Sequence, residues 1–330
     1  RDRHDTADFS KWKRLKKYSK AGVSRLYGEA KEEMDYYIFV QYHLDRQLRE
    51  SHEYARAKGV ALKGDIPIGI TPHSVEAWAE PEYFNMGEQA GAPPDAFAAD
   101  GQNWGFPTYN WDRMAEDGFA WWKRRFRKMA EYFDAYRIDH VLGFFRIWEI
   151  PVPFKSGLMG HFSPALPYSE DDIRWRGFPF HLERHARPYA DNDPREVLFL
   201  EDPVHKGLWH PRISAQYTRS YNDLQQWEKD AYNRLYDEFF YTRNTEFWRE
   251  QAMRKLPELI GATNMLTCAE DLGMIPACVP QVLNDLHILS LEVQRMPKDP
   301  KQMLGNPAEY PYMSVCTTGS HDTSTLRGWW

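Results

Sequence analysis

The stretch AYRIDH, residues 135–140, shows the pattern from which the fold of this chain is predicted. Its apolar residues predict a short strand, and its charged tip follows directly after Ile138. A helix is predicted immediately before it, over residues 111–133. The pattern is therefore a helix followed by a short strand, with charged residues directly after the strand.

The same pattern of a helix followed by a short strand recurs on both sides of this stretch. An amphipathic helix is predicted over residues 32–57, where apolar side chains repeat at helical spacing, and a strand follows within residues 60–70. Three more short strands are expected later in the chain, centred on residues 266–269, 289–293 and 313–316. Helices that alternate with short strands are typical of a parallel α/β fold. We predict a (β/α)8 TIM barrel with insertions, present as an incomplete segment of about five strands.

Three parts are expected along the chain. Residues 1–150 form a barrel segment that includes an active-site loop at 91–110, rich in glycine, proline and aromatic residues. Residues 151–255 form an insertion plus helices, and residues 256–330 continue the barrel to a truncated end. The first part of the insertion lacks any sustained periodicity and is expected to hold little regular structure. The opening residues lack an initiator methionine, so we expect a piece of a larger protein.

The composition argues against several classes of protein. No run of about 18 uncharged apolar residues is present, which speaks against a membrane span. Three cysteines without CxxC spacing indicate neither a disulfide framework nor a zinc site, and we expect a cytoplasmic location. The net charge is -6, and the basic run at residues 11–20 is interpreted as a solvated face rather than a nucleic-acid patch. Neither a membrane nor a nucleic acid is an expected partner.

Aromatic residues make up 15% of the chain, including 13 tryptophans. The flat C–H face of a pyranose stacks on such rings, while its hydroxyls bind Asp, Glu, Arg and Gln side chains. Most of the rings are expected to be core residues. Their abundance is still compatible with a protein that binds sugars.

Acidic residues follow the ends of several predicted strands, where barrel enzymes carry their chemistry. Retaining cleavage of an α-glucosidic bond needs two carboxyl groups about 5 Å apart. Asp139 is the predicted nucleophile, because Arg137 projects to the same face of the strand and favours its ionised form. Glu270 is the predicted acid/base, because partial burial raises the pKa of a carboxyl group. Asp322, beside His321, is expected to stabilise the transition state.

Taken singly, an aspartate after a strand is more often a turn former or a helix cap, so the prediction depends on the combination. That combination resembles the 4-α-glucanotransferases, or amylomaltases, of glycoside hydrolase family 77. The likeness is carried by GDIPI (64–68), PPD (93–95) through GQNWG (101–105), YRIDH (136–140), AEDLG (269–273) and HDT with LRGWW (321–330). It implies that Asp139 is the nucleophile, Glu270 the acid/base and Asp322 the transition-state stabiliser. It also implies substrate contacts from Asp65, Phe97, Gln102, Trp104, Arg137 and His321.

A finer resemblance is to the maltose-using cytosolic branch of plants and some bacteria, through GFFRIWEIP (143–151) and the long insertion before Glu270. It implies retaining transfer of α-1,4-glucosyl units from maltose or maltooligosaccharides to glycogen-like or starch-like glucans, through a covalent glucosyl-enzyme. The strands would then be about strands three to seven of the barrel. The mechanism needs no metal or organic cofactor, although scattered aspartates are able to bind calcium. The alternatives are an α-glucan hydrolase of the α-amylase type and a non-catalytic glucan-binding protein.

Overall fold

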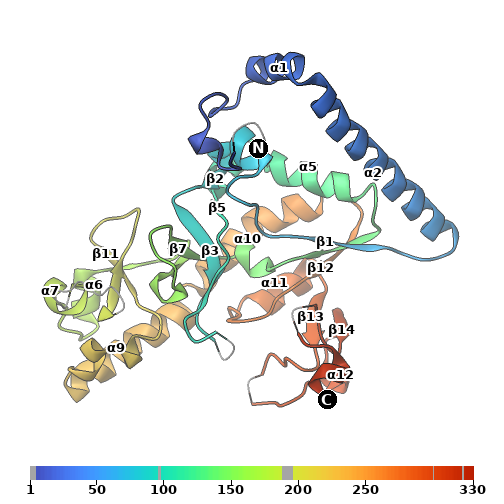
Figure 1. Cartoon of the computed structure of the whole chain (residues 1–330). Coiled ribbons are helices and arrows are strands. Elements are labelled where there is room, and N and C mark those ends of the chain that lie inside the picture. Colours follow the sequence, from blue (N-terminus) through green and yellow to red (C-terminus); the bar gives the residue numbers. More distant parts are fainter. Residues whose placement is uncertain (1–4, 96–97, 188–195, 300, 322) are drawn as a thin grey trace. The chain divides into compact units, whose positions relative to one another are not determined.

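The computed structural model of the chain describes residues 5–95, 98–187, 196–299, 301–321 and 323–330 (Figure 1). The chain divides into two compact units, each assembled from separate stretches of sequence. Unit 1 consists of Arg1–Met86, Phe106–Asp139 and Pro257–Cys268. Unit 2 consists of Gly87–Gly105, His140–Leu256 and Ala269–Trp330. Within the described residues, no helix is both long and apolar enough to cross a membrane.

The centre of unit 1 is a three-stranded sheet in the order β1-β6-β12. Its strands are β1 (Lys63–Ile66), β6 (Ala135–Ile138) and β12 (Leu266–Ala269), and β1 runs parallel to β6. Alternate side chains point to opposite faces, so Ile66, Tyr136 and Ile138 are buried while Asp65 and Arg137 lie on the other face. The predicted strand at residues 266–269 is confirmed.

Two helices stand where the sequence predicted one over residues 111–133. They are α4 (Trp111–Glu116) and α5 (Ala120–Met129). The helix breaks because Gly118 and Phe119 adopt left-handed backbone conformations, with φ of 67° and 60°. The Phe126 ring of α5 packs against Tyr136 of β6, with ring centroids 4.9 Å apart, and so anchors this helix to the sheet.

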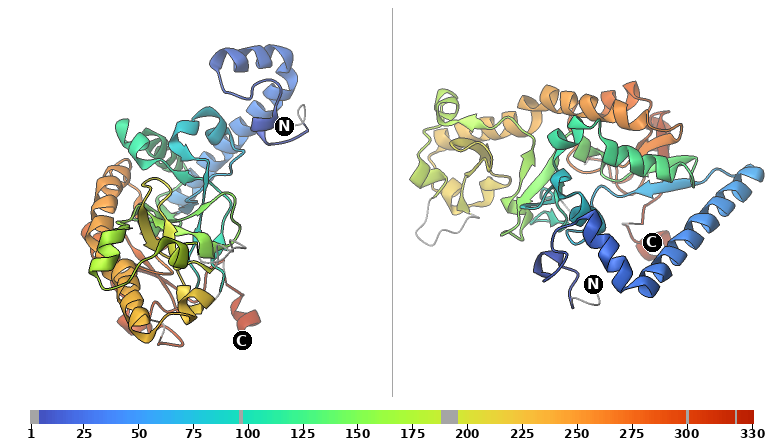
Figure 2. Two further views of the ribbon diagram at one scale, coloured as in Figure 1. Left: turned by 90° about the vertical axis from the view of Figure 1, so that its left-hand side faces the viewer. Right: turned by 90° about the horizontal axis from the view of Figure 1, so that it is seen from above.

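The predicted helix over residues 32–57 is confirmed as α2 (Lys31–Ala57), preceded by α1 (Lys20–Glu29). Figure 2 shows these two helices joined end to end at an angle. The apolar side chains that suggested an amphipathic helix remain exposed, including Tyr37 at 61%, Leu44 at 47% and Leu48 at 44%. Unit 1 is completed by short elements: α3 (Val75–Ala79) and the antiparallel pair β2 (Phe84–Asn85) and β5 (Thr108–Tyr109).

Unit 2 contains a four-stranded antiparallel sheet in the order β4-β3-β7-β8. Its strands are β3 (Glu88–Ala92), β4 (Gln102–Asn103), β7 (Ile147–Pro151) and β8 (His161–Ser163). Gly91 permits the close approach of β3 and β4, because a Cβ there would lie 2.0 Å from the Gln102 carbonyl oxygen. The hairpin carries the part of the 91–110 loop that holds Gln102 and Trp104.

Residues 168–222 have more regular structure than their sequence predicts. Where this stretch is described, up to residue 187 and from residue 196, it holds a three-stranded sheet in the order β10-β11-β9 and three short α-helices. The elements are β9 (Tyr168–Ser169), α6 (Glu170–Trp175), α7 (Leu182–His185), β10 (Phe199–Glu201), β11 (Leu208–Pro211) and α8 (Arg219–Asn222). None of them exceeds six residues, which is too short to show a helical or strand period.

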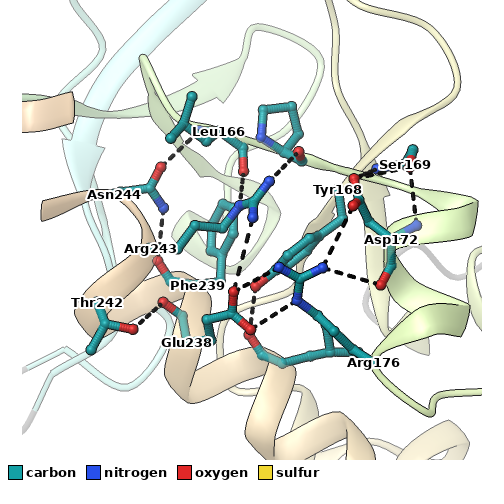
Figure 3. Close-up of polar contacts among 12 residues, drawn as sticks. Leu166, Tyr168, Ser169, Asp172, Arg176, Glu238, Phe239, Thr242, Arg243 and Asn244 are labelled. Atoms are coloured by element: carbon teal, nitrogen blue, oxygen red, sulfur yellow. Dashed lines mark hydrogen bonds and ion pairs between the residues drawn. The ribbon is translucent and has the colours of Figure 1, made fainter. Parts of the chain in front are cut away.

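A longer helical segment follows, as predicted. It consists of α9 (Gln226–Asp237), a π-helical turn η8 (Glu238–Arg243) and α10 (Thr245–Ile260). Glu238 accepts hydrogen bonds from Arg176 Nε and Nη2 at 2.9 and 3.0 Å (Figure 3). The Tyr168 ring lies 5.0 Å from the Arg176 guanidinium and 4.3 Å from that of Arg243. These contacts fix the π-helical turn to the small sheet.

The last predicted strands are confirmed as a parallel pair, β13 (Ser290–Val293) and β14 (Ser314–Thr317). Ala269 N–H donates to the Leu289 carbonyl at 2.7 Å, so the end of β12 is joined to the start of β13. The helices α11 (Val279–Asp285) and α12 (Leu326–Trp329) complete unit 2. Parallel strands that alternate with helices confirm the α/β class.

Candidate functional site

Unit 1 carries a cluster of three charged residues at the end of its sheet. Asp65 and Arg137 occupy paired positions on β1 and β6, which places their side chains on the same face. Arg137 Nη1 donates to both Asp65 oxygens, at 3.0 and 2.8 Å. The same nitrogen lies 2.8 Å from Asp139 Oδ1, so the ion pair expected between residues 137 and 139 is present.

The environment of this cluster suits an ionised carboxylate. The Arg137 side chain is only 13% exposed, whereas Asp139 is 38% exposed. A partly buried guanidinium favours the charged form of a neighbouring carboxyl group and fixes its orientation. Asp139 thus contacts a cation and remains accessible, and both features suit a carboxylate nucleophile.

Glu270 belongs to unit 2 and follows directly after β12, as Asp139 follows directly after β6. Its side chain is 13% exposed and is held by main-chain donors. His140 N–H donates to Glu270 Oε2 and Leu272 N–H to Oε1, both at 2.9 Å. Val141 N–H donates to the Glu270 carbonyl at 2.9 Å, so main chain and side chain are fixed together. Both carboxyl oxygens are thus oriented by neutral main-chain donors.

His140 connects Glu270 to the loop that carries Gln102 and Trp104. Its backbone is left-handed, with φ of 47°, and its Nδ1 lies 4.0 Å from Glu270 Oε2. The Trp104 ring packs edge-on against the His140 ring at 4.9 Å, and Trp104 Nε1 donates to Gln102 Oε1 at 2.9 Å. Burial, reinforced by the Arg146 guanidinium, lowers the pKa of His140 to about 3. The imidazole is therefore neutral at neutral pH.

Arg146 fixes the turn that follows Glu270. Its side chain is buried against the rings of Phe162 and Trp248, at 4.0 and 5.1 Å, and its Nη2 donates to the Met274 carbonyl. Burial lowers the pKa of Arg146 to about 9. A buried cation at this point contributes both packing and a fixed anchor for the turn.

Asp271, the neighbour of Glu270, belongs to a second buried set of charges. Its Oδ1 accepts from Leu291 N–H at 2.9 Å, and its Oδ2 from Lys298 Nζ at 2.8 Å. Lys298 Nζ also donates to Glu292 Oε1 at 2.8 Å. Burial raises the pKa of Asp271, while Lys298 opposes that shift. These contacts attach the end of β12 to the end of β13.

The remaining predicted residues are placed as follows. His321 is exposed in the segment after β14. Asp322 and Phe97 lie outside the described residues, so their predicted roles remain predictions. Among the described residues, no group of three or more His, Cys, Asp or Glu side chains is arranged to hold a metal ion.

Sequence reasoning did not assign roles to His140, Arg146 or Lys298. His140 was detectable as the residue after Asp139 in the same motif, although nothing in the sequence marked its contact with Glu270. Arg146 and Lys298 carry no signal that separates them from surface cations. Their contacts depend on the tertiary fold.

A comparison with known families decides the affiliation of the chain. The model for 4-alpha-glucanotransferase, glycoside hydrolase family 77, matches residues 1–330. The chain belongs to the 4-alpha-glucanotransferase family. The family predicted by resemblance is thereby confirmed.

Members of the family with curated descriptions match along nearly the whole chain. The chain is 37% identical over 398 residues to 4-alpha-glucanotransferase DPE2 of Oryza sativa subsp. japonica, covering 100% of the chain and 42% of that protein. It is 26% identical over 329 residues to the chloroplastic/amyloplastic 4-alpha-glucanotransferase of Solanum tuberosum, covering 96% of the chain and 42% of that protein. The chain therefore spans less than half the length of these 4-alpha-glucanotransferases.

A solved structure shares the fold. The chain is similar to the amylomaltase from Streptococcus agalactiae in complex with acarbose, with a TM-score of 0.66 and 20% identity. The likeness covers 99% of this chain and 51% of that one. At this level of identity it shows the fold of the 4-alpha-glucanotransferase chain and no more.

Proposed function

We propose that the protein containing this chain is a retaining 4-α-glucanotransferase. It moves α-1,4-glucosyl units from maltose or maltooligosaccharides to glycogen-like or starch-like glucan acceptors. Membership of the family supports the reaction class. The observation that carries the assignment of roles is that one guanidinium, Arg137, contacts Asp139, while Glu270 is held by main-chain donors and a neutral histidine.

In the first half of the proposed reaction, Asp139 attacks the anomeric carbon of the donor glucosyl unit. The bond from that carbon to the 4-oxygen of the next glucose unit breaks as Glu270 donates a proton to that oxygen, and the leaving group is free glucose when maltose is the donor. The product is a glucosyl ester on Asp139. Asp65 and Arg137 are proposed to bind sugar hydroxyls and to orient the nucleophile.

In the second half, Glu270 removes the proton from the 4-hydroxyl of an acceptor glucan. The acceptor oxygen attacks the anomeric carbon, Asp139 leaves as a carboxylate, and the α-linkage is restored. Transfer exceeds hydrolysis when the acceptor is positioned better than water. Gln102, Trp104 and Phe97, in the 91–110 loop, are proposed to position it.

The finer predictions belong to the same proposal. The parallel strands represent about strands three to seven of a (β/α)8 barrel, and residues 151–255 are an insertion between barrel segments. Asp322 is the transition-state stabiliser and His321 a sugar ligand. The three cysteines, Cys268, Cys278 and Cys316, are free thiols, which supports the predicted cytoplasmic location.

The product profile of the full-length protein on maltose and glycogen tests the proposal. We expect free glucose together with lengthened glucan chains, and loss of both in Asp139→Asn. Asp112→Asn, at an exposed aspartate on α4 of the same unit, is the matched control and should behave like the wild type. Glucose without chain extension would identify a hydrolase, and glucan binding without turnover would identify a non-catalytic protein.

A further inference from the structure

The segment of residues 318–324 follows directly after β14 and carries His321; by sequence it also contains Asp322. Its base is fixed by the pairing of β14 with β13, in which Val293 lies opposite Thr317. Gln294 N–H extends this pairing by donating to the Thr317 carbonyl at 2.9 Å. Beyond residue 317 the segment leaves the sheet, so other contacts must determine its conformation.

Arg295 makes those contacts from the neighbouring strand end. Its Nε donates to the Thr318 carbonyl at 2.8 Å. Its Nη2 donates to the Ser324 carbonyl at 2.7 Å and to Thr323 Oγ1 at 3.1 Å. One side chain therefore contacts Thr318 before His321 and Thr323 and Ser324 after it.

The surroundings of Arg295 are shaped for a guanidinium. A Cβ at Gly319 would lie 1.9 Å from Arg295 Nη2, so the glycine leaves the space that the planar group occupies. The Trp329 ring of α12 lies 5.7 Å from the guanidinium carbon. Arginine presents several donors in a rigid planar fork, whereas lysine offers a single point of charge. A lysine cannot reproduce all three hydrogen bonds at once.

The residues after β13 also contact the neighbour of Glu270, the proposed acid/base. Lys298, three residues after Arg295, donates to Asp271, the neighbour of Glu270. The short stretch at residues 294–298 thus contacts the segment after β12 through Lys298 and the segment after β14 through Arg295. Figure 1 shows β13 and β14 side by side, with α12 next to them.

We propose that Arg295 is a positioning residue, which holds the 318–324 segment in the conformation that the transfer reaction uses. The inference deepens the proposed function and rests on it, because it assigns to Arg295 an effect on catalysis through residues that are proposed to bind sugar. Arg295 itself acts through hydrogen bonds to main-chain carbonyls and a threonine hydroxyl.

The test uses Arg295→Gln, Arg295→Lys and the control Arg249→Gln in the full-length protein. Arg249 lies on α10 in unit 2 and forms an exposed ion pair with Glu246. We expect Arg295→Gln to lower kcat by roughly 10²-fold, with KM for maltose close to the wild-type value, as for a group displaced by about 1 Å. Arg295→Lys should recover part of the activity, and Arg249→Gln should match the wild type.

Hydrogen exchange supplies a readout that does not depend on activity. Peptides covering residues 318–324 should exchange faster in Arg295→Gln, while peptides from α9 and β7 should not change. Wild-type kcat in Arg295→Gln, or faster exchange throughout unit 2, would overturn the inference. A wild-type protein without transfer activity would instead overturn the proposed function, so the two failures are distinguishable.

Gly319→Ala tests the same contact from the opposite side. The added methyl group displaces the guanidinium, so this variant should reproduce the kcat loss of Arg295→Gln. The double variant should be hardly worse than either single one, because both changes remove one contact. Fully multiplied losses would show that the two residues act independently and would contradict the inference.

Discussion

Asp139 in unit 1 and Glu270 in unit 2 are carboxyl groups held in different ways. Asp139 contacts a full positive charge, Arg137, which also holds Asp65. Glu270 contacts main-chain N–H groups and an imidazole that remains neutral. A nucleophile must stay ionised, whereas an acid/base must gain and lose a proton in each cycle. The contrast supports the proposed roles of the two residues independently of the motif in which they occur.

The largest expected effect comes from removing the carboxyl group of Glu270, the proposed proton donor. Glu270→Gln should lower kcat for transfer from maltose by about 10²–10⁴-fold, the range of general acid catalysis. With α-glucosyl fluoride as donor, the first step needs little acid assistance and should be much less affected. The rate of the first step, measured as the burst of glucose or fluoride release before the slow second step limits turnover, gives the difference between the two donors. Equal losses with both donors would argue that Glu270 is not the acid.

Removing the cation should have the next largest effect. Arg137→Met removes the cation that contacts both Asp65 and Asp139, so both carboxylates lose the partner that orients them. We expect kcat/KM to fall by roughly 10²-fold, as for a reacting group displaced by about 1 Å. Arg137→Lys, which retains the charge, should lose less. A kcat/KM of Arg137→Met close to the wild-type value would break the contrast between the two carboxyl groups.

A smaller effect is expected at His140. Asparagine tolerates the left-handed backbone, so His140→Asn keeps the N–H that binds Glu270 and loses the ring contact with Trp104. An aromatic contact of this kind contributes about 0.5–1.5 kcal/mol, so kcat/KM should fall by roughly two- to tenfold. A loss as large as that of Glu270→Gln would mean that the imidazole takes part in proton transfer.

The same variant should change the response of stability to acid. The pKa of His140 is about 3 in the folded chain and ordinarily 6.5, so between these values only the unfolded chain binds the proton. Stability is therefore lost as the pH falls through this window. His140→Asn should lose less thermal stability than the wild type between pH 6.5 and 4.5, measured as the shift in Tm.

The smallest effect is expected at Glu88 and concerns the pH dependence of stability. This carboxyl group is partly buried beside another carboxyl group, Glu149, rather than beside a cation. Burial and the nearby Glu149 raise the pKa of Glu88 to about 7 from 4.5. Between these values the folded chain keeps a proton that the unfolded chain has released, so stability falls as the pH rises.

Glu88→Gln removes this ionisation and should be about 1–2 kcal/mol more stable relative to the wild type at pH 8 than at pH 5, allowing for partial exposure. Thermal unfolding at the two pH values measures the difference. Glu250→Gln, on an exposed face of α10, is the control. A stability difference between Glu88→Gln and the wild type that does not change with pH would show that Glu88 titrates in its ordinary range.

The sequence predicted the features that depend on local spacing. The strands at residues 266–269 and 313–316 were located to within one residue, because each is an apolar run too short for a helix. The Arg137–Asp139 ion pair was predictable because residues two apart share one face of a strand. The break between α4 and α5 was not, since a left-handed Phe119 is not apparent from residue types.

The contacts that shape the site depend on distant parts of the chain. His140 and Glu270 are 130 residues apart in sequence, and Arg295 bonds residues 23 to 29 positions later. The sequence around His140 and Arg295 carries no local signal of these contacts. The exposed face of α2 shows the opposite case, because helical periodicity predicted the helix correctly but not the burial of its apolar side chains.

Trapping the glucosyl-enzyme tests the central claim most directly. Glu270→Gln in the full-length protein would be incubated with α-glucosyl fluoride and no acceptor, then digested and examined by mass spectrometry. We predict one added glucosyl unit on the peptide that contains Asp139, because the first step proceeds while the second step, which needs a general base, is slow. A glucosyl unit on another residue, or release of a β-configured product without any adduct, would contradict the assignment of Asp139 and Glu270.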